Sequence, residues 1–444
     1  EKVPLKVENM APWEIWVSES QERMMFTVKP EDVDRVLARC KAWDVEAVPI
    51  GKVITEKRNI VRFNGVEILN LDLEFTTGGP VYSRPYNLPD YDTGSAAPLP
   101  EYPADLGKTI LDLVSQPEVA SKDWVIRQYD HEVRGKTALK PIQGPIGKDV
   151  PGDSSVLKPV DDSWKGLALT ADVNPYLMEA NPYHGTMSAV EEVCRNLAAV
   201  GARIDSLADC LCFGNPRKPD IMGQFKASCE ALRDAAIAVD VPYVSGNVSL
   251  YNETSDGAIP PTPVLMGVGL VEDIRNCTTS DMKKDGSIWL IGKTKEEMGA
   301  SLYYRSIGKD CPNIPKTDFD SFIPRMEQLI QAIEQGEVVA CHDISTGGIA
   351  TAVIEMCMSG VGANIRLGED VRADVELFSE SNGRWIVQVA NGKEKDFARR
   401  FDYATRIGEV GSKVSFSKNN EIIADFEVEK LRKKWTMPVW DRLA

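Results

Sequence analysis

Apolar residues recur at helical spacing in two long stretches in the middle of the chain. The first stripe ends at Gly201, and the second lies in the segment that opens at Pro219. Residues three and four apart share one face of a helix, so each stripe predicts an amphipathic helix that packs on a core. The stripe residues are Met187, Val190, Val193, Leu197 and Val200 in the first, and Met222, Phe225, Cys229, Leu232 and Ala236 in the second.

A mixed apolar and polar pattern also occurs twice. "SESQERMMFTV" at 18–28 and "SESNGRWIVQV" at 379–389 share five of eleven residues, and "IGKV" at 50–53 answers "IGEV" at 407–410. The nearly constant offset predicts an internal duplication, two copies of one supersecondary unit.

Each copy is expected to fold as strand, helix, strand. In the first copy the predicted strands are "MMFTV" at 24–28 and "EAVPIGKV" at 46–53. Between them the apolar residues Val33, Val36 and Leu37 follow helical spacing.

The second copy has much more sequence ahead of it, from a β-rich run after Gly286 through the helix-like "FIPRMEQLIQAI" to the strand-to-helix turn "CHDISTGGIATAVIEM". Projected back by the repeat offset, the first copy should begin before Glu1. We therefore expect the first unit to be truncated in this chain, which also lacks an initiating Met.

Composition narrows the class of protein. With 43% hydrophobic and 27% charged residues the chain is globular, and its net charge of −16 argues against binding a nucleic-acid backbone. No apolar run has the length of a membrane span or a signal peptide, so a soluble, cytoplasmic protein with no membrane partner is expected. Nine cysteines without a CxxC pair suit reduced thiols.

Individual cysteines and histidines offer little chemistry at this stage. Cys210 and Cys212 flank one residue of a predicted strand, and we expect them to point to opposite faces and to pack in the core. The three histidines are too few to suggest a histidine-based metal site, and His342 is expected to be a satisfied core residue rather than a catalyst. The three are His131, His184 and His342.

The segment "VPYVSGNVSLYNET", residues 241–254, runs from an apolar strand into small and amide residues. Gly246 lets a phosphate or ribose approach the backbone, and Asn247 offers an oxygen that Mg²⁺ accepts. Ser249 adds a hydroxyl group. An ordinary loop has the same composition, so this alternative stays open.

A second segment, "SLADCLCFGNPRKPD" at 206–220, makes a turn before a helix opened by Pro219. Asp209 lies near this Gly-rich turn, where an acid can meet a nucleotide or its metal; capping of a turn is the alternative.

Two further motifs each allow two interpretations. "HDISTGG" at 342–348 could hold an anion at a helix N-terminus, or could be a helix cap with turn glycines. "SESQER" places Glu19, Ser20 and Gln21 at the start of a strand, as hydrogen-bonding groups for a sugar or amide, or simply as a turn that the repeat needs.

Taken together, these motifs resemble the phosphoribosylformylglycinamidine synthase family, in its small PurL-type subunit. "ADCLCFGNPRKPD", "SGNVSLYNET", "PPTPV" followed by "GLVEDI", "HDISTGG" and both "SES" motifs occur in the family's order. The resemblance implies an α/β (α+β) fold of duplicated aminoimidazole ribonucleotide synthetase-like units. Each unit has an N-terminal and a C-terminal α/β domain.

On this resemblance the chain has four parts. Residues 1–80 correspond to the back portion of the first unit's C-terminal-type domain, and the Pro- and Gly-rich 81–105 to a linker. Residues 106–273 correspond to the second unit's N-terminal-type domain with a nucleotide and metal site, and 274–444 to its C-terminal-type domain.

The resemblance also implies roles for individual residues. These are Asp209 and Gly246 for ATP, Asn247 for Mg²⁺, and Glu19, Ser20, Gln21 and Ser249 for the substrate. The family's catalytic histidines and acidic Mg²⁺ ligands belong to the first unit, so no catalytic residue is expected in this chain.

The implied activity is that of an ATP-dependent carbon-nitrogen ligase in purine biosynthesis. It converts formylglycinamide ribonucleotide and ammonia from glutamine into the amidine, with release of ADP and phosphate. The implied partners are a PurQ-type glutaminase subunit, a small PurS-type subunit and the missing N-terminal unit.

The chain departs from the family's pattern at two motifs, and two other functions stay open. Thr346 stands where many relatives carry Asp, and "SESNGR" lacks the Gln of the first copy. The chain could be another ATP-using member of the same superfamily, although the repeat and "GNVSLYNE" disfavour this. It could also be a non-catalytic half that a nucleotide stabilises.

Overall fold

Both apolar stripes form helices, as the sequence predicts. In the computed structural model, α7 spans Pro182–Ala199 and α8 spans Pro219–Val239. The structure describes residues 1–79, 81–90, 98–309, 311–401 and 403–443. The chain divides into two units, 1–83 and 84–444, which we describe separately.

The first unit contains small elements and a hairpin. α1 covers Pro12–Val17, a short 3₁₀ turn at Pro30–Asp32 leads into α2 at Val33–Ala42, and α3 covers Leu73–Thr77. β1 (Arg58–Phe63) and β2 (Val66–Asp72) are joined by Asn64 and Gly65, both with positive φ, as a tight hairpin turn requires. None of the described residues of this unit is buried.

The two strands predicted in the first repeat copy are wrong, although its helix is confirmed as α2. Residues 24–28 and 46–53 have no regular secondary structure, and Met24, Met25 and Phe26 are 71–84% exposed. In the second copy both strands form, because each pairs with β13. Within the described part of 1–83, no strand pairs with residues 24–28, and unpaired backbone groups do not sustain a strand.

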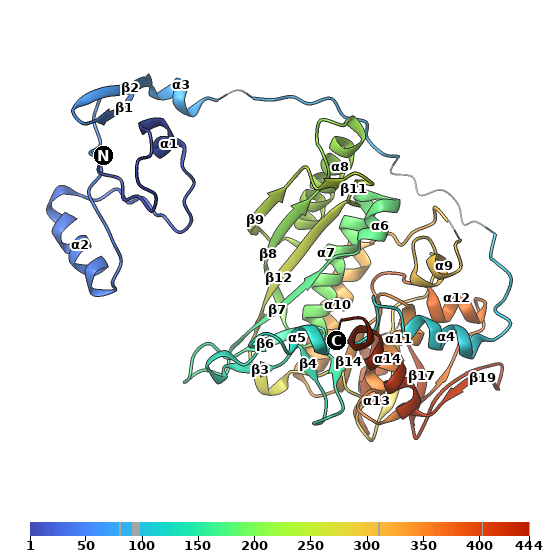
Figure 1. Cartoon of the computed structure of the whole chain (residues 1–444). Coiled ribbons are helices and arrows are strands. Elements are labelled where there is room, and N and C mark those ends of the chain that lie inside the picture. The colour runs from blue at the N-terminus through green and yellow to red at the C-terminus, as the bar shows by residue number, and fades with distance from the viewer. Residues whose placement is uncertain (80, 91–97, 310, 402, 444) are drawn as a thin grey trace. The chain divides into compact units, whose positions relative to one another are not determined.

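A six-stranded sheet forms the first layer of the second unit (Figure 1). All neighbouring strands are antiparallel except β8 and β9, which run parallel, with β9 at the sheet edge. In sheet order the strands are β3 Thr137–Leu139, β6 Ser155–Leu157, β7 Gly166–Asp172, β12 Thr262–Val271, β8 Arg203–Cys212 and β9 Tyr243–Ser249. Two small hairpins accompany it: β4 Ile142–Gln143 with β5 Val150–Pro151, and β10 Glu253–Thr254 with β11 Gly257–Ala258.

Helix α7 packs directly on this sheet. Asn181 caps its first turn by accepting a hydrogen bond from the His184 N–H at 3.1 Å, and Pro182 occupies the first helical position. Gly267 on β12 permits the close approach, because a Cβ there would lie 2.4 Å from Val193 Cγ1. Val193 and Leu197 are fully buried, which confirms the predicted core role of the first stripe.

The second unit also contains a seven-stranded sheet. Its strands, in sheet order, are β14 Val338–Asp343, β16 Trp385–Val389, β13 Ser287–Ile291, β17 Ala404–Gly411, β15 Gly362–Arg366, β18 Val414–Lys418 and β19 Glu421–Phe426. The accompanying helices are α4 Leu106–Val114, α5 Asp123–Ile126, α6 Pro175–Ala180, α9 Leu302–Ser306, α10 Phe319–Glu334, α11 Gly348–Cys357, α12 Ala373–Phe378, α13 Glu394–Arg400 and α14 Val428–Leu443.

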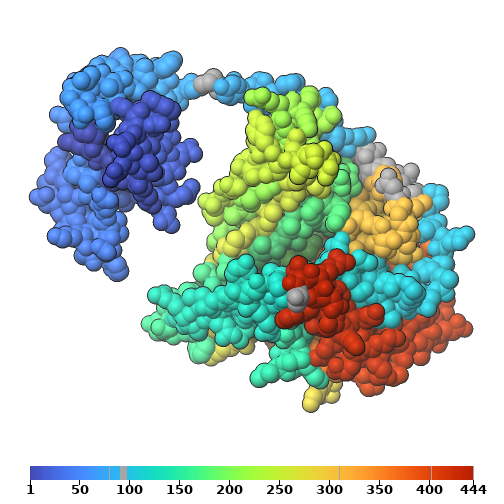
Figure 2. Space-filling view, viewed as in Figure 1, coloured from blue at the N-terminus to red at the C-terminus, as the bar shows by residue number. Residues whose placement is uncertain are grey.

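One hydrophobic core joins the two sheets. It combines α7 residues with Phe322 of α10 and Trp385 of β16, whose rings stack with centroids 5.6 Å apart. The C-terminal helix α14 lies against α4 (Figure 2). Trp435 of α14 donates its indole N–H to the Val119 carbonyl at 2.9 Å. No helix among the described residues is long and apolar enough to cross a membrane.

The segment that follows the first unit is held on two helix N-termini. Asn87 donates its backbone N–H to Pro219 O at 3.0 Å and its side-chain amide to Asp220 at 2.7 Å. The Asp90 carbonyl accepts from the Asn181 amide at 3.0 Å. A Cβ on Gly223 would lie 1.7 Å from Asn87 O, so this glycine is needed for the contact.

Candidate functional site

The parallel pairing of β8 and β9 brings the two predicted nucleotide residues together. Asp209 lies directly opposite Gly246, and a Cβ on Gly246 would lie 2.9 Å from Oδ2 of Asp209. Partial burial raises the pKa of Asp209. The Asp209 carboxylate therefore lies against the backbone of Gly246, and only a glycine at 246 permits this contact.

Asn247 and Ser249 lie on the other face of β9, since side chains alternate along a strand. Asn247 pairs with Cys210 and donates its side-chain amide to Cys210 Sγ at 3.3 Å. Ser249 pairs with Cys212. The structure thus groups Asp209 with Gly246, and Asn247 with the two cysteines.

The expectation that Cys210 and Cys212 point to opposite faces is wrong. Their Sγ atoms are 3.7 Å apart, and both side chains are only half-buried. Residues two apart in a strand share a face, so the pair projects from one side of β8. Leu211, between them, is the residue that enters the core.

The turn after β8 and the turn after β9 are tied together. The Glu253 carboxylate accepts from the Asn215 N–H at 2.8 Å and from Lys218 Nζ at 2.9 Å, and Asn252 donates to the Phe213 carbonyl at 3.0 Å. This places the N-terminus of α8 at the carboxyl ends of two parallel strands. Such an arrangement favours anions, because free N–H groups and the helix dipole point toward them.

The first "SES" copy lies in the first unit and is exposed. Glu19 and Ser20 are in irregular structure and Gln21 is in a turn, so their predicted place at the start of a strand is wrong. The Ser18 and Ser20 hydroxyls are 3.1 Å apart, and Arg23 donates to the Ser18 carbonyl at 2.6 Å. Their assignment to a substrate stays a prediction.

The second "SES" copy is internal. Ser379 Oγ donates to the Lys295 carbonyl at 2.7 Å, and Glu380 accepts from the N–H groups of Gly347 and Leu302 at 2.7 and 2.9 Å. Gly347 is the N-cap residue of α11, so the anion held at this helix terminus is the carboxylate of Glu380 itself. Arg384 is the last residue of the "SESNGR" motif, and burial lowers its pKa to about 9.

A buried cluster of charges between the two sheets escaped the sequence analysis. Arg195 on α7 is 1% exposed; it pairs with Glu191, with Glu192 at 3.2 Å and with Asp343 of β14 at 3.1 Å. Burial alone would lower the pKa of Arg195, but the attraction of these carboxylates outweighs it and raises that pKa. The spacing of acids three and four residues before an Arg on one helix face was the available signal, but it is also common on exposed helices.

His342 joins the same region and is a satisfied structural residue. Its Nδ1 is 2.9 Å from Asp153 and its Nε2 is 3.2 Å from Glu355. Burial disfavours the imidazolium, but the two carboxylates outweigh it and raise the pKa of His342 well above its usual value. Asp153, His342 and Asp343 could also hold a metal ion, as their ligand atoms lie within 4.8 Å of one another.

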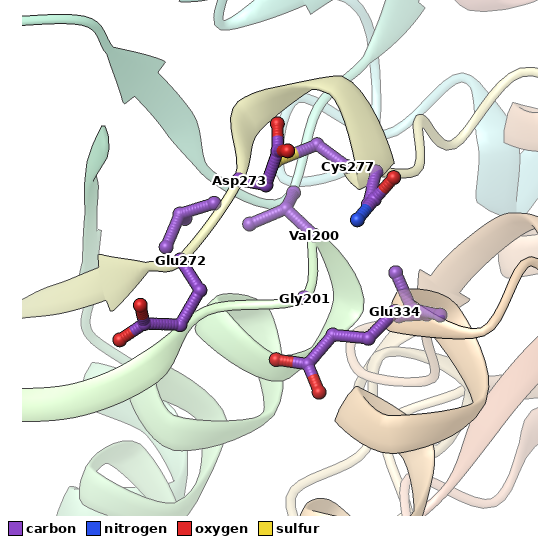
Figure 3. A pocket seen from close by; sticks show the side chains of 9 residues that line it. Val200, Gly201, Glu272, Asp273, Cys277 and Glu334 are labelled. Atoms are coloured by element: carbon purple, nitrogen blue, oxygen red, sulfur yellow. The ribbon is translucent and has the colours of Figure 1, made fainter. Parts of the chain in front are cut away.

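A pocket of about 290 Å³ lies away from the predicted nucleotide residues. It lies where β12 ends and β8 begins, opposite the end of β8 that carries Asp209. Figure 3 shows the carboxylates of Glu272, Asp273 and Glu334 around it. Each is paired already, with Lys165, Arg275 and Arg203 respectively. The pocket therefore offers no free charge for a ligand.

Two family models match this chain. The model described as AIR synthase related protein, N-terminal domain, matches residues 151–271. The model described as AIR synthase related protein, C-terminal domain, matches twice, at 1–64 and 281–417. The double match agrees with the repeat found in the sequence.

Among curated proteins, the chain is 34% identical to phosphoribosylformylglycinamidine synthase subunit PurL of Thermoplasma acidophilum, over 98% of this chain and 57% of that protein. It is 39% identical to the Thermococcus sibiricus protein of the same name, over 95% of this chain and 58% of the relative. The chain therefore spans less than two thirds of the length of these relatives.

Solved structures share the fold. "T. maritima PurL complexed with ATP" superposes with a TM-score of 0.62 at 20% identity, covering 92% of this chain and 58% of that one. "T. maritima PurL complexed with FGAR" gives a TM-score of 0.59 at 17% identity, over 74% and 54%. The two family models, which together match most of the chain, and the curated relatives show that the chain belongs to the AIR synthase related proteins and is of the PurL type.

Proposed function

We propose that this chain contributes the nucleotide site of a phosphoribosylformylglycinamidine synthase. The proposed reaction joins ammonia from glutamine to formylglycinamide ribonucleotide, with ATP as the energy source. The observation that carries the proposal is the pairing of Asp209 with Gly246 on the parallel strands β8 and β9, whose carboxyl ends meet the turn before α8. The names of the curated relatives support the reaction assigned to it.

The residues present fit a nucleotide. Gly246 lets the Asp209 carboxylate lie against the backbone of β9, and that carboxylate can accept hydrogen bonds from ribose hydroxyl groups. The N-terminus of α8, with Arg217 just ahead of it, favours phosphate oxygens. When bound, ATP supplies the transferable phosphoryl group and Mg²⁺ offsets its charge.

Further assignments belong to the same proposal. Asn247 serves as a Mg²⁺ ligand through its amide oxygen, and Ser249 with Glu19, Ser20 and Gln21 contacts the ribonucleotide substrate. PurQ-type and PurS-type subunits are its proposed partners, and the cytoplasm its compartment. We assign no catalytic residue in this chain.

Substitution of Gly246 by valine is expected to weaken ATP binding at least about tenfold, or about 1.4 kcal/mol. The added side chain would collide with the Asp209 carboxylate and displace it. Isothermal titration of ATP and Mg²⁺ into both proteins measures the change. Val248→Ala, at an exposed position on the same strand, is the matched control. Equal affinity of Gly246→Val and wild type would contradict the nucleotide assignment.

The reaction itself is tested by reconstitution. The chain, combined with the N-terminal part of a PurL relative, is assayed for ADP formation with and without formylglycinamide ribonucleotide and ammonia. We expect ADP only when both are present, and Asn247→Ala should reduce the rate. ADP formation that ignores the amide would contradict the synthase proposal. An unchanged rate in Asn247→Ala would favour a half that only binds nucleotide.

A further inference from the structure

Cys210 and Cys212 form a dithiol on the surface of β8. Their sulfurs are 3.7 Å apart, and neither side chain is buried in the core. Four other cysteines are buried: Cys194, Cys311, Cys341 and Cys357. Among the described residues, no other two cysteine sulfurs are recorded in contact. The pair therefore differs in kind from the cysteines that pack in the cores.

The spacing of the sulfurs suits a shared metal ion. Zinc binds thiolate sulfur at about 2.3 Å with tetrahedral angles, which requires two ligand sulfurs about 3.8 Å apart. The observed separation of 3.7 Å meets this requirement without movement of the strand. Because both side chains project from one face of one strand, the backbone already holds the two donors together.

The surroundings supply a further donor. The Asn247 amide on β9 lies against Cys210, with Nδ2 3.3 Å from Sγ. Rotation of this amide would present its oxygen to an ion held by the sulfurs. Thr262 and Val264 of β12 flank the cysteines on the other side. Thiolates select thiophilic ions over Mg²⁺, which prefers oxygen donors.

We propose that Cys210 and Cys212 bind a thiophilic divalent metal ion, of the zinc or cadmium class, as a two-thiolate site on the open face of β8. Binding converts two thiols into two thiolates coordinated to one ion and releases two protons. Asn247 and solvent complete the coordination. The two thiolates, with Asn247 as a further donor, make the site, which stands whether or not the chain takes part in amidine synthesis.

Cadmium titration of the intact chain tests the proposal, since the ultraviolet thiolate-to-cadmium absorption band reports sulfur ligation directly. We expect one ion to bind per chain. Cys210→Ser and Cys212→Ser should each lower the cadmium affinity by more than about 100-fold, which exceeds the loss expected for a residue that only orients a metal ligand. Cys229→Ser, at another half-buried cysteine, is the control and should bind as wild type. An undiminished band in the Cys210→Ser, Cys212→Ser double variant would overturn the proposal.

A second measurement needs no variant. Phenylarsine oxide reacts with two adjacent thiols to form two As–S bonds with loss of one water. Trypsin releases residues 204–217 as a peptide whose only cysteines are Cys210 and Cys212. We expect mass spectrometry to find the arsenical bridging both thiols of this peptide, and prior zinc to protect them. Labelling elsewhere, or labelling that zinc leaves unchanged, would overturn the proposal.

Discussion

Replacement of Arg195 by alanine is expected to lower the free energy of unfolding by about 3–5 kcal/mol, the range for removing one partner of a buried ion pair. The guanidinium group touches Glu191, Glu192 and Asp343, and both Glu191 and Arg195 are at most 1% exposed. Without it, several carboxylates would remain close together with no opposite charge. Because Arg195 lies on α7 and Asp343 on β14, the loss should also loosen the contact between the two sheets.

Equilibrium urea unfolding measures this effect. Arg203→Ala is the matched control, since Arg203 also pairs with two glutamates but is 35% exposed. An exposed pair contributes at most about 1 kcal/mol. Arg195→Lys should fall between the two, because a lysine keeps the charge and loses the planar, multiple donors. If Arg195→Ala were no less stable than Arg203→Ala, the buried pairing would be wrong.

Helices with a wide apolar stripe could be predicted from the sequence, because the residues that define them also bury them. Val193 and Leu197 were assigned to the core by spacing alone and are fully buried. The closeness of Asp209 and Gly246 follows from a βαβ unit, whose parallel strands end at one edge. That Asp209 lies directly opposite Gly246 depends on the register of β8 and β9, which spacing along the chain does not determine.

The strand predictions in the first copy could not succeed from local pattern. Residues 24–28 and 385–389 have similar sequences, but only the second copy has β13 beside it. Strand formation depends on a partner elsewhere in the chain. The Arg195 cluster was missed for a related reason. Acidic and basic residues spaced in this way along a helix usually face solvent. In this chain β14 packs against α7 and buries Glu191 and Arg195.

Glu380 is expected to make stability fall as pH rises. Burial raises the pKa of this carboxyl to about 7, against the lowering by hydrogen bonds from Gly347 and Leu302. Its unfolded value is near 4.3. A folded pKa above the unfolded one means that the native state binds the proton more tightly, so the contribution is complete below about pH 4.3 and is lost by about pH 7. The full effect is on the order of 3 kcal/mol.

The difference between wild type and Glu380→Gln isolates this titration, since shared groups cancel. The variant should match wild type near pH 4.5 and become the more stable protein by pH 8, because its neutral amide keeps an acceptor for both N–H groups without a buried charge. Glu380→Ala removes the acceptor and should be less stable than Glu380→Gln by about 1–3 kcal/mol at every pH. Asp172→Asn should reproduce the Gln result, as burial raises the pKa of Asp172 to about 7 as well. A difference between Glu380→Gln and wild type that stays constant with pH would mean that Glu380 is ionised in the folded chain throughout, with the N-terminus of α11 compensating fully for its burial.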